Sequence, residues 1–157
     1  MPKLRPIEPD AITSLPVQVV EDASFRCTPV QLVASFKSDE DWKDWFNLKV
    51  TRTTTGAYRE GFTRTVKAGP MVLHEVFTEW TEPNEMSFYV DRTNNPLLKA
   101  FAEHYLVTET ATGCTFRWQI GMEFTRAGQL VAPLFKAAMA RSARRGFPKL
   151  EALALKR

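Results

Sequence analysis

The chain has 157 residues and a net charge of +3, and 44% of its residues are hydrophobic while 25% are charged. These proportions are typical of an ordinary globular protein and exclude a low-complexity or strongly charged chain. At this length we expect one domain with a substantial core. No run of about 18 apolar residues occurs, so the sequence predicts no transmembrane helix.

The basic residues and the cysteines indicate the environment of the protein. Basic side chains gather near the C-terminus at Arg141, Arg144, Arg145, Lys149, Lys156 and Arg157. We interpret them as the solvated face of a helix rather than a site for an anionic partner, so we expect no nucleic-acid binding. Cys27 and Cys114 show neither metal-ligand spacing nor a disulfide framework, which predicts reduced thiols in a cytoplasmic protein.

The first elements follow a proline-rich start. Residues 1–14 are predicted to be an extended or mobile arm, and residues 15–157 a single domain. Residues 17–25 mix β-branched and polar side chains, which predicts a strand. Residues 28–36 then predict a short helix, with Thr28 as its N-cap.

The stretch "SDEDWKDWF", residues 38–46, predicts a second short helix capped by Ser38. Trp42, Trp45 and Phe46 fall on one face of this helix. Because a helix of this length is marginally stable alone, we expect its aromatic face to pack against a large apolar surface.

Six further strands are predicted from apolar residues that lie between turn signals. They span residues 48–54, 57–68, 71–80, 85–93, 99–110 and 114–124. Their short connections predict antiparallel neighbours. The final segment, residues 129–156, has helical spacing and is long enough to cross the sheet. Gly146 and Pro148 are predicted to interrupt it.

The strand at residues 114–124 alternates between an apolar and a polar face. Its apolar face carries Cys114, Phe116, Trp118, Ile120, Met122 and Phe124. A sheet with one apolar face needs a cover, and the long C-terminal helix is the expected one. The interior between them is either a solid core or a cavity, and the sequence leaves both open.

The order of these elements, together with several local motifs, resembles the START-like helix-grip (SRPBCC) superfamily, which includes polyketide cyclase/dehydrase and lipid-transport proteins. The motifs are "SDEDWKDWFNLKVT", "GFTRTVKAG", "LHEVFTEWTEPNEMSFYV" and "TGCTFRWQI". The resemblance covers residues 15–157. It implies an α+β fold in which a seven-stranded curved antiparallel sheet wraps around the long C-terminal helix, with two short helices between strands 1 and 2.

Strand alternation and the resemblance together select three candidate catalytic residues. The resemblance places Arg64 and Glu75 on inward faces. For residues 99–110 alternation leaves two faces, one with His104 and one with Glu103, and we expect His104 to point inward. Arg64 is a candidate to hold a carboxylate, phenolate or enolate, and Glu75 or His104 a general acid or base. The alternatives are an Arg64–Glu75 ion pair and a histidine of purely structural role.

Apolar and aromatic side chains are expected to line the pocket. The candidate ligand-binding residues are Trp45, Phe62, Phe77, Phe88, Phe116, Trp118, Ile120, Phe135 and Met139. The alternative is that they only pack the core. The two histidines lie far apart, so we predict no metal site, and we expect no cofactor.

Three functions are consistent with the sequence. The first is binding of a small hydrophobic ligand, such as a lipid, a polyketide or an aromatic metabolite, by a monomer or homodimer. The second is a polyketide aromatase/cyclase or dehydratase, which needs a positioned acid and base. The third is a module that binds a macromolecular partner, and a fully packed interior would favour it.

Overall fold

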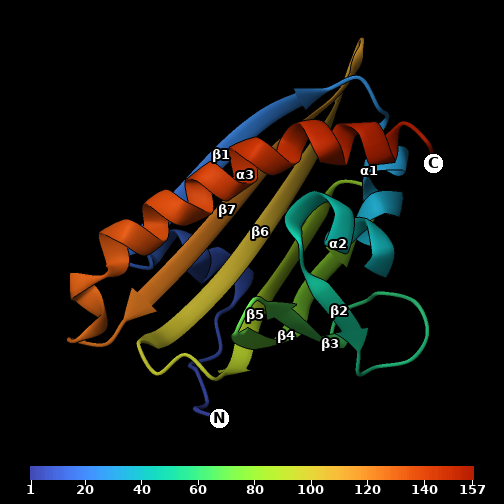
Figure 1. Ribbon diagram of the computed structural model, residues 1–157. Helices are drawn as coiled ribbons and strands as arrows, with labels where there is room; N and C mark the ends of the chain where they lie inside the picture. The colour runs from blue at the N-terminus through green and yellow to red at the C-terminus, as the bar shows by residue number, and fades with distance from the viewer.

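Seven antiparallel strands form one sheet in the order β1-β7-β6-β5-β4-β3-β2 (Figure 1). The computed structural model describes all residues, Met1–Arg157. The strands are β1 (Val17–Phe25), β2 (Lys49–Arg52), β3 (Thr63–Ala68), β4 (Met71–Thr81), β5 (Glu85–Thr93), β6 (Leu98–Thr110) and β7 (Gly113–Phe124). The helices are α1 (Pro29–Phe36), α2 (Asp39–Phe46) and α3 (Ala132–Ala154), with short 3-10 turns at Pro9–Ser14 (η1) and Gly128–Leu130 (η2).

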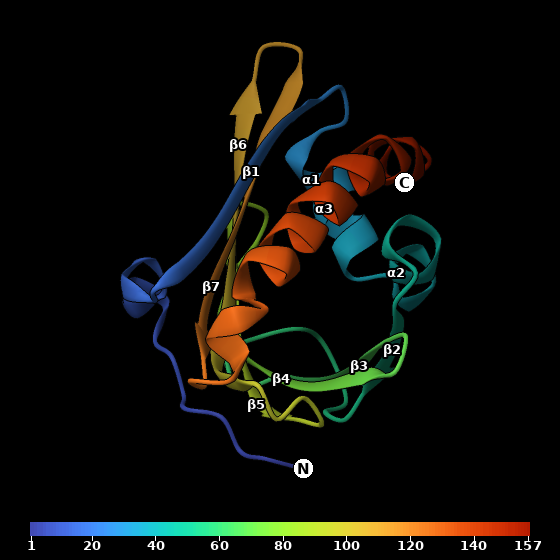
Figure 2. The same cartoon turned by 60° about the vertical axis from the view of Figure 1, so that its left-hand side comes forward.

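This architecture confirms the predicted α+β helix-grip fold. The sheet bends around α3, which runs across its concave face, while α1 and α2 close one end (Figure 2). None of the helices combines the length and the apolar character needed to cross a lipid bilayer.

The two short helices begin where their caps were predicted. The Thr28 hydroxyl accepts a hydrogen bond from the Gln31 backbone N–H, and the Gln31 side chain accepts one from the Thr28 backbone N–H. The Ser38 hydroxyl accepts a bond from the Asp41 backbone N–H at 3.2 Å. These caps satisfy donors that a helix leaves free in its first turn, so both helices start at fixed residues.

The C-terminal helix differs from its prediction. It is one continuous α-helix from Ala132 to Ala154, although Pro148 lies inside it. Gly146 has a packing role, because a Cβ at this position would lie 3.1 Å from the Trp45 carbonyl oxygen. The absence of a side chain therefore lets α2 approach α3 closely.

Residues 57–62 were predicted to belong to a strand, but β3 starts only at Thr63. Gly61 adopts a φ of 78°, which is the left-handed region and breaks the extended conformation. Tyr58 is nevertheless buried and stacks on Trp80, with ring centroids 4.5 Å apart.

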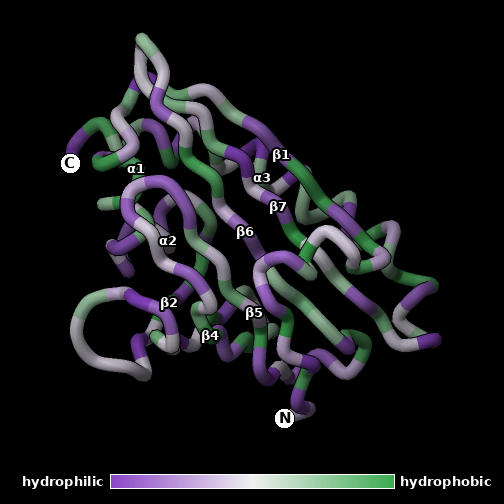
Figure 3. Tube along the Cα trace, turned by 180° about the vertical axis from the view of Figure 1, so that it is seen from behind, coloured by the Kyte–Doolittle hydropathy of each residue, from purple (hydrophilic) through white to green (hydrophobic).

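Hydrophobic and hydrophilic residues alternate along the strands (Figure 3). On β7 the six residues of the predicted apolar face are buried. Arg64 on β3 and Glu75 on β4, which the resemblance placed inward, are buried as well. Strand β6 is buried on both faces. Phe101, Glu103, Tyr105 and Val107 share the side that faces α3, while Ala100 and Ala102 lie under the N-terminal arm.

The N-terminal arm, residues 1–14, packs against the sheet on the side away from α3 (Figure 2). Strands β5 and β6 pair only between Glu85–Tyr89 and Ala102–Leu106, and then separate. The arm bonds to both strands beyond this point, because Leu4 N–H donates to Asp91 O and Arg5 N–H donates to Lys99 O. These contacts hold the start of the arm against the sheet. From its prolines, the sequence predicted this segment to be extended or mobile.

Two further contacts fit the arm to the sheet. The Leu4 side chain is 3% exposed and belongs to the main hydrophobic core. On β7, a Cβ at Gly121 would lie 2.6 Å from the Ile12 carbonyl oxygen, so only glycine allows η1 to lie this close. We infer that the arm is part of the folded domain.

The Leu4→Ala variant tests this inference. Deleting a buried leucine side chain lowers the free energy of unfolding by about 2–4 kcal/mol, because the apolar contacts are lost and a cavity remains. Urea denaturation gives the value, and Leu130→Ala is a matched control, since Leu130 is 85% exposed. A Leu4→Ala protein as stable as the control would mean that the arm is detached in solution.

Candidate functional site

A cavity of about 50 Å³ lies between α2, α3 and the concave face of the sheet. Its lining is mostly apolar and aromatic but includes three ionisable side chains. The lining residues are Trp42, Phe46, Leu48, Arg64, Val66, Ala68, Met71, Leu73, Glu75, Phe88, Phe101, Glu103, Tyr105, Trp118 and Met139. Ionisable groups inside an apolar pocket mark a candidate binding or catalytic site.

Arg64 and Glu75 form a buried ion pair. They lie directly opposite each other on β3 and β4, and their side chains are 2% and 5% exposed. Arg64 Nε donates to Glu75 Oε2 at 2.5 Å. The guanidinium also lies over the ring of Trp42 at 4.7 Å, with Phe77 and Phe88 at 5.1 and 5.4 Å. The aromatic faces stabilise the cation in a place with little access to water.

Glu103 is the third ionisable group, and it has no basic partner within ion-pair distance. Its Oε2 accepts hydrogen bonds from Tyr105 Oη at 2.8 Å and from Trp118 Nε1 at 2.6 Å. Burial, followed by the nearby Glu75 carboxylate, raises the pKa of Glu103 to about 8. The two donors and Arg64 oppose this rise without cancelling it.

At neutral pH the three groups therefore form an uncharged set. Burial also raises the pKa of Glu75, and the Arg64 guanidinium opposes the rise. Of the two carboxyl groups, Glu75 is the one whose ionised form is stabilised by direct contact with a cation. One cation, one carboxylate and one carboxylic acid sum to zero. A protonated Glu103 can donate a hydrogen bond or a proton, and the ionised Glu75 can accept one.

The rim of the cavity is made of half-buried residues from four elements or the turns beside them. These are Phe46, Leu48, Ala68, Met71 and Met139. Pockets for small ligands usually measure about 300–1,000 Å³, so a ligand of ordinary size needs this rim to open. Methionine side chains are unbranched and flexible, so Met71 on β4 and Met139 on α3 can change conformation without unfolding the sheet.

The structure places five of the predicted site residues in this cavity: Arg64, Glu75, Phe88, Trp118 and Met139. Six others pack outside its lining. Trp45, Phe62, Phe77, Phe116 and Ile120 are buried in the core, and Phe135 packs edge-on against Phe124.

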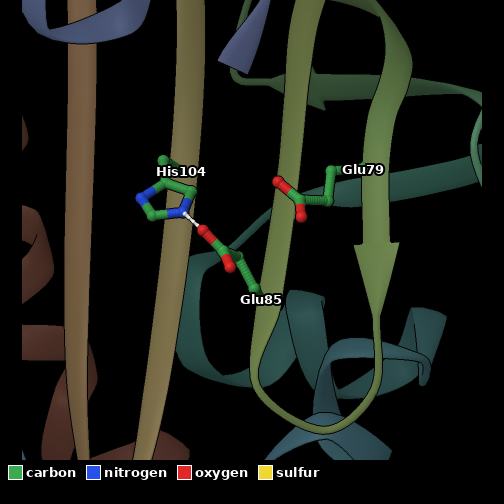
Figure 4. A group of neighbouring side chains, drawn as sticks. All are labelled: Glu79, Glu85 and His104. Carbon is green, nitrogen blue, oxygen red and sulfur yellow. Dashed lines mark hydrogen bonds and ion pairs between the residues drawn. The ribbon is translucent and has the colours of Figure 1, made fainter. Parts of the chain in front are cut away.

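The prediction that His104 points inward is wrong. Its Nε2 contacts Glu85 Oε1 at 2.7 Å on the outer face of the sheet, beside Glu79 (Figure 4). The residue of β6 that points into the cavity is Glu103. Alternation distinguished the two faces of this strand, and the prediction selected the wrong one. Trp42 was expected to pack inside, and its position over Arg64 was not predicted.

Comparison with known proteins now identifies the family. Residues 16–154 match the family described as polyketide cyclase / dehydrase and lipid transport. The chain belongs to this family. The match, together with the fold, confirms the resemblance to the START-like helix-grip superfamily.

Two relatives that are similar in sequence are uncharacterized proteins of Mycobacterium tuberculosis (strain H37Rv) and Mycobacterium bovis. Each is 32% identical to this chain over 99 residues, which is 61% of this chain. The aligned part spans 59% of the length of these relatives.

Solved structures share the fold at low sequence identity. The di-domain ARO/CYC StfQ from the steffimycin biosynthetic pathway has a TM-score of 0.73 at 8% identity, over 94% of this chain and 54% of that one. TTHA0849 from Thermus thermophilus has a TM-score of 0.71 at 15% identity, over 89% and 98%. MLL2253 from Mesorhizobium loti has a TM-score of 0.69 at 18% identity, over 89% and 98%. These similarities establish the helix-grip fold of this family member.

Proposed function

We propose that this polyketide cyclase/dehydrase and lipid transport family protein binds a small, uncharged hydrophobic molecule that carries a hydroxyl or carbonyl group. The observation that carries the proposal is the neutral set of Arg64, Glu75 and Glu103 in an aromatic cavity. A ligand oxygen can accept from the protonated Glu103 or donate to Glu75. A charged ligand is disfavoured, because it would leave a net charge in a buried place.

The test compares three naphthalene probes by isothermal titration calorimetry at pH 7. We expect 2-naphthol to bind more tightly than naphthalene, which has no oxygen, and than naphthalene-2-sulfonate, which is charged. Affinity arises from burial of the aromatic rings, and the hydroxyl adds hydrogen bonds to the ionisable set. Tryptophan fluorescence should change as well, since Trp42 and Trp118 line the cavity.

A pair of size-matched variants locates the binding. Ala68→Phe places a ring in the rim of the cavity and should weaken 2-naphthol binding at least tenfold. Ala137→Phe adds the same ring to the exposed face of α3 and should leave binding unchanged. Absence of saturable binding to the wild type, or equal binding to both variants, would contradict the proposal and favour the partner-binding function.

One observation favours a second function, catalysis of cyclisation or dehydration. Glu103, which is protonated at neutral pH, lies beside the Arg64–Glu75 ion pair, whose carboxylate can act as a base. A general acid and a general base are therefore both available to transfer protons to and from a bound substrate. Binding and turnover are distinguished by incubating the protein with a linear poly-β-keto thioester and following loss of water by mass spectrometry.

A further inference from the structure

A second group of ionisable side chains lies on the outer face of the sheet, away from the cavity. It consists of Glu79 from β4, Glu85 from β5 and His104 from β6 (Figure 4). One ligand atom from each of these three side chains lies within 4.8 Å of the others. The proposed function uses none of them.

The sheet holds the three residues in fixed register. Glu79 pairs with Ser87, and Ser87 pairs with His104. Glu85 lies two residues before Ser87 on the same strand, so it shares the same face. Three neighbouring strands thus present one ligand each, and backbone pairing rather than a loop sets their spacing.

Ser87 provides an independent observation at the same place. It is fully buried, and its hydroxyl has no hydrogen-bond partner. By register it lies between Glu79 and His104, on the face that carries all three ligands. Buried hydroxyls normally have a partner, and a water molecule held by a cation above Ser87 would supply one.

The charge of the group is also uncompensated. Glu79 forms no ion pair, and Glu85 contacts only His104, without a lysine or arginine. The side chains of His104 and Glu85 are 20% and 41% exposed, so an ion can reach them from solvent. Two carboxylates and one imidazole within reach of one another form a donor set that attracts a divalent cation.

We propose that Glu79, Glu85 and His104 bind a Zn²⁺ ion on the outer face of the sheet. Imidazole nitrogen and carboxylate oxygen are both zinc ligands, whereas Mg²⁺ and Ca²⁺ prefer sites made of oxygen alone. A tetrahedral zinc ion with bonds of about 2.0–2.2 Å keeps its ligand atoms roughly 3.4 Å apart. On binding, Glu85 Oε1 and His104 Nε2, which are 2.7 Å apart, separate by roughly 0.7 Å to admit the ion, and the Glu79 side chain closes in by about an ångström. Water takes the fourth position, within reach of the Ser87 hydroxyl.

The experiment titrates Zn²⁺ into the untagged, full-length protein by isothermal titration calorimetry. We expect saturation at one zinc per chain, with at least tenfold weaker binding in Glu79→Gln, Glu85→Gln and His104→Gln. His74→Gln is the matched control, because His74 is the other histidine of the chain and bonds to Thr65 instead. This control should bind zinc as the wild type does.

Two further readouts separate loss of the site from loss of the fold. Co²⁺ in place of zinc should give the visible absorption of a tetrahedral site in the wild type and in His74→Gln only. Zinc at about one hundred times its dissociation constant should raise the melting temperature of the wild type by roughly 5–10 °C. No saturable binding, or glutamine variants that fold and bind zinc like the control, would overturn the proposal.

Discussion

The Arg64→Met variant is expected to lose about 3–5 kcal/mol of unfolding free energy at pH 7. Arg64 and Glu75 are both buried, and their side chains contact each other at 2.5 Å. Removing the guanidinium leaves the Glu75 carboxylate in the interior without its cation, and the interactions with the rings of Trp42, Phe77 and Phe88 are lost too. Urea denaturation of the purified variant measures the loss.

The double variant Arg64→Met/Glu75→Leu is the control. It removes both charges and keeps similar volumes, so its stability should return to within about 1 kcal/mol of the wild type or exceed it. Glu75 can protonate in acid, so the single variant should also lose less stability at pH 5 than at pH 7. If the single variant lost less than about 1 kcal/mol, water must reach the pair and the site is not closed as described.

The Glu103→Gln variant is expected to abolish a decline in stability that the wild type shows between pH 4.5 and pH 8. The pKa of Glu103 is about 8 in the folded protein, compared with 4.5 for an unperturbed glutamate. Over this interval the folded state keeps a proton that the unfolded state releases, so stability falls as the pH rises. The fall from this one group is on the order of 4 kcal/mol.

Glutamine cannot ionise, so it preserves stability on the alkaline side. Its amide oxygen can accept the bonds from Tyr105 and Trp118 that Glu103 accepts in the wild type. We therefore expect the variant to resemble the wild type at pH 5 and to be the more stable protein at pH 9. Guanidinium denaturation across this range tests it, with Glu109→Gln at an exposed position as the control. Parallel pH profiles for Glu103→Gln and the wild type would show that Glu103 is ionised when folded.

The inward positions of Arg64 and Glu75 were predicted from the resemblance to the helix-grip superfamily, because alternation by itself leaves both faces of β4 apolar. Arg64 and Val66 on β3 point inward, as does Phe62 just before the strand, so a single charged residue interrupts a buried row. The resemblance to the helix-grip superfamily then selected the matching face of β4. Opposite charges placed across from each other on paired strands form an ion pair wherever water is excluded.

The sequence by itself determined the order of the elements, the caps at Thr28 and Ser38, and the alternation that sets two faces on each strand, because these features depend on residues close in the chain. The choice between Glu103 and His104 depended on tertiary structure. Strand β6 is apolar on both sides, since α3 covers one face and the N-terminal arm covers Ala100 and Ala102 on the other. The alternation of side chains along β6 therefore does not show which face of the strand points into the interior. Only the packing of two distant segments against β6 put Glu103 in the cavity and His104 beside Glu79 and Glu85.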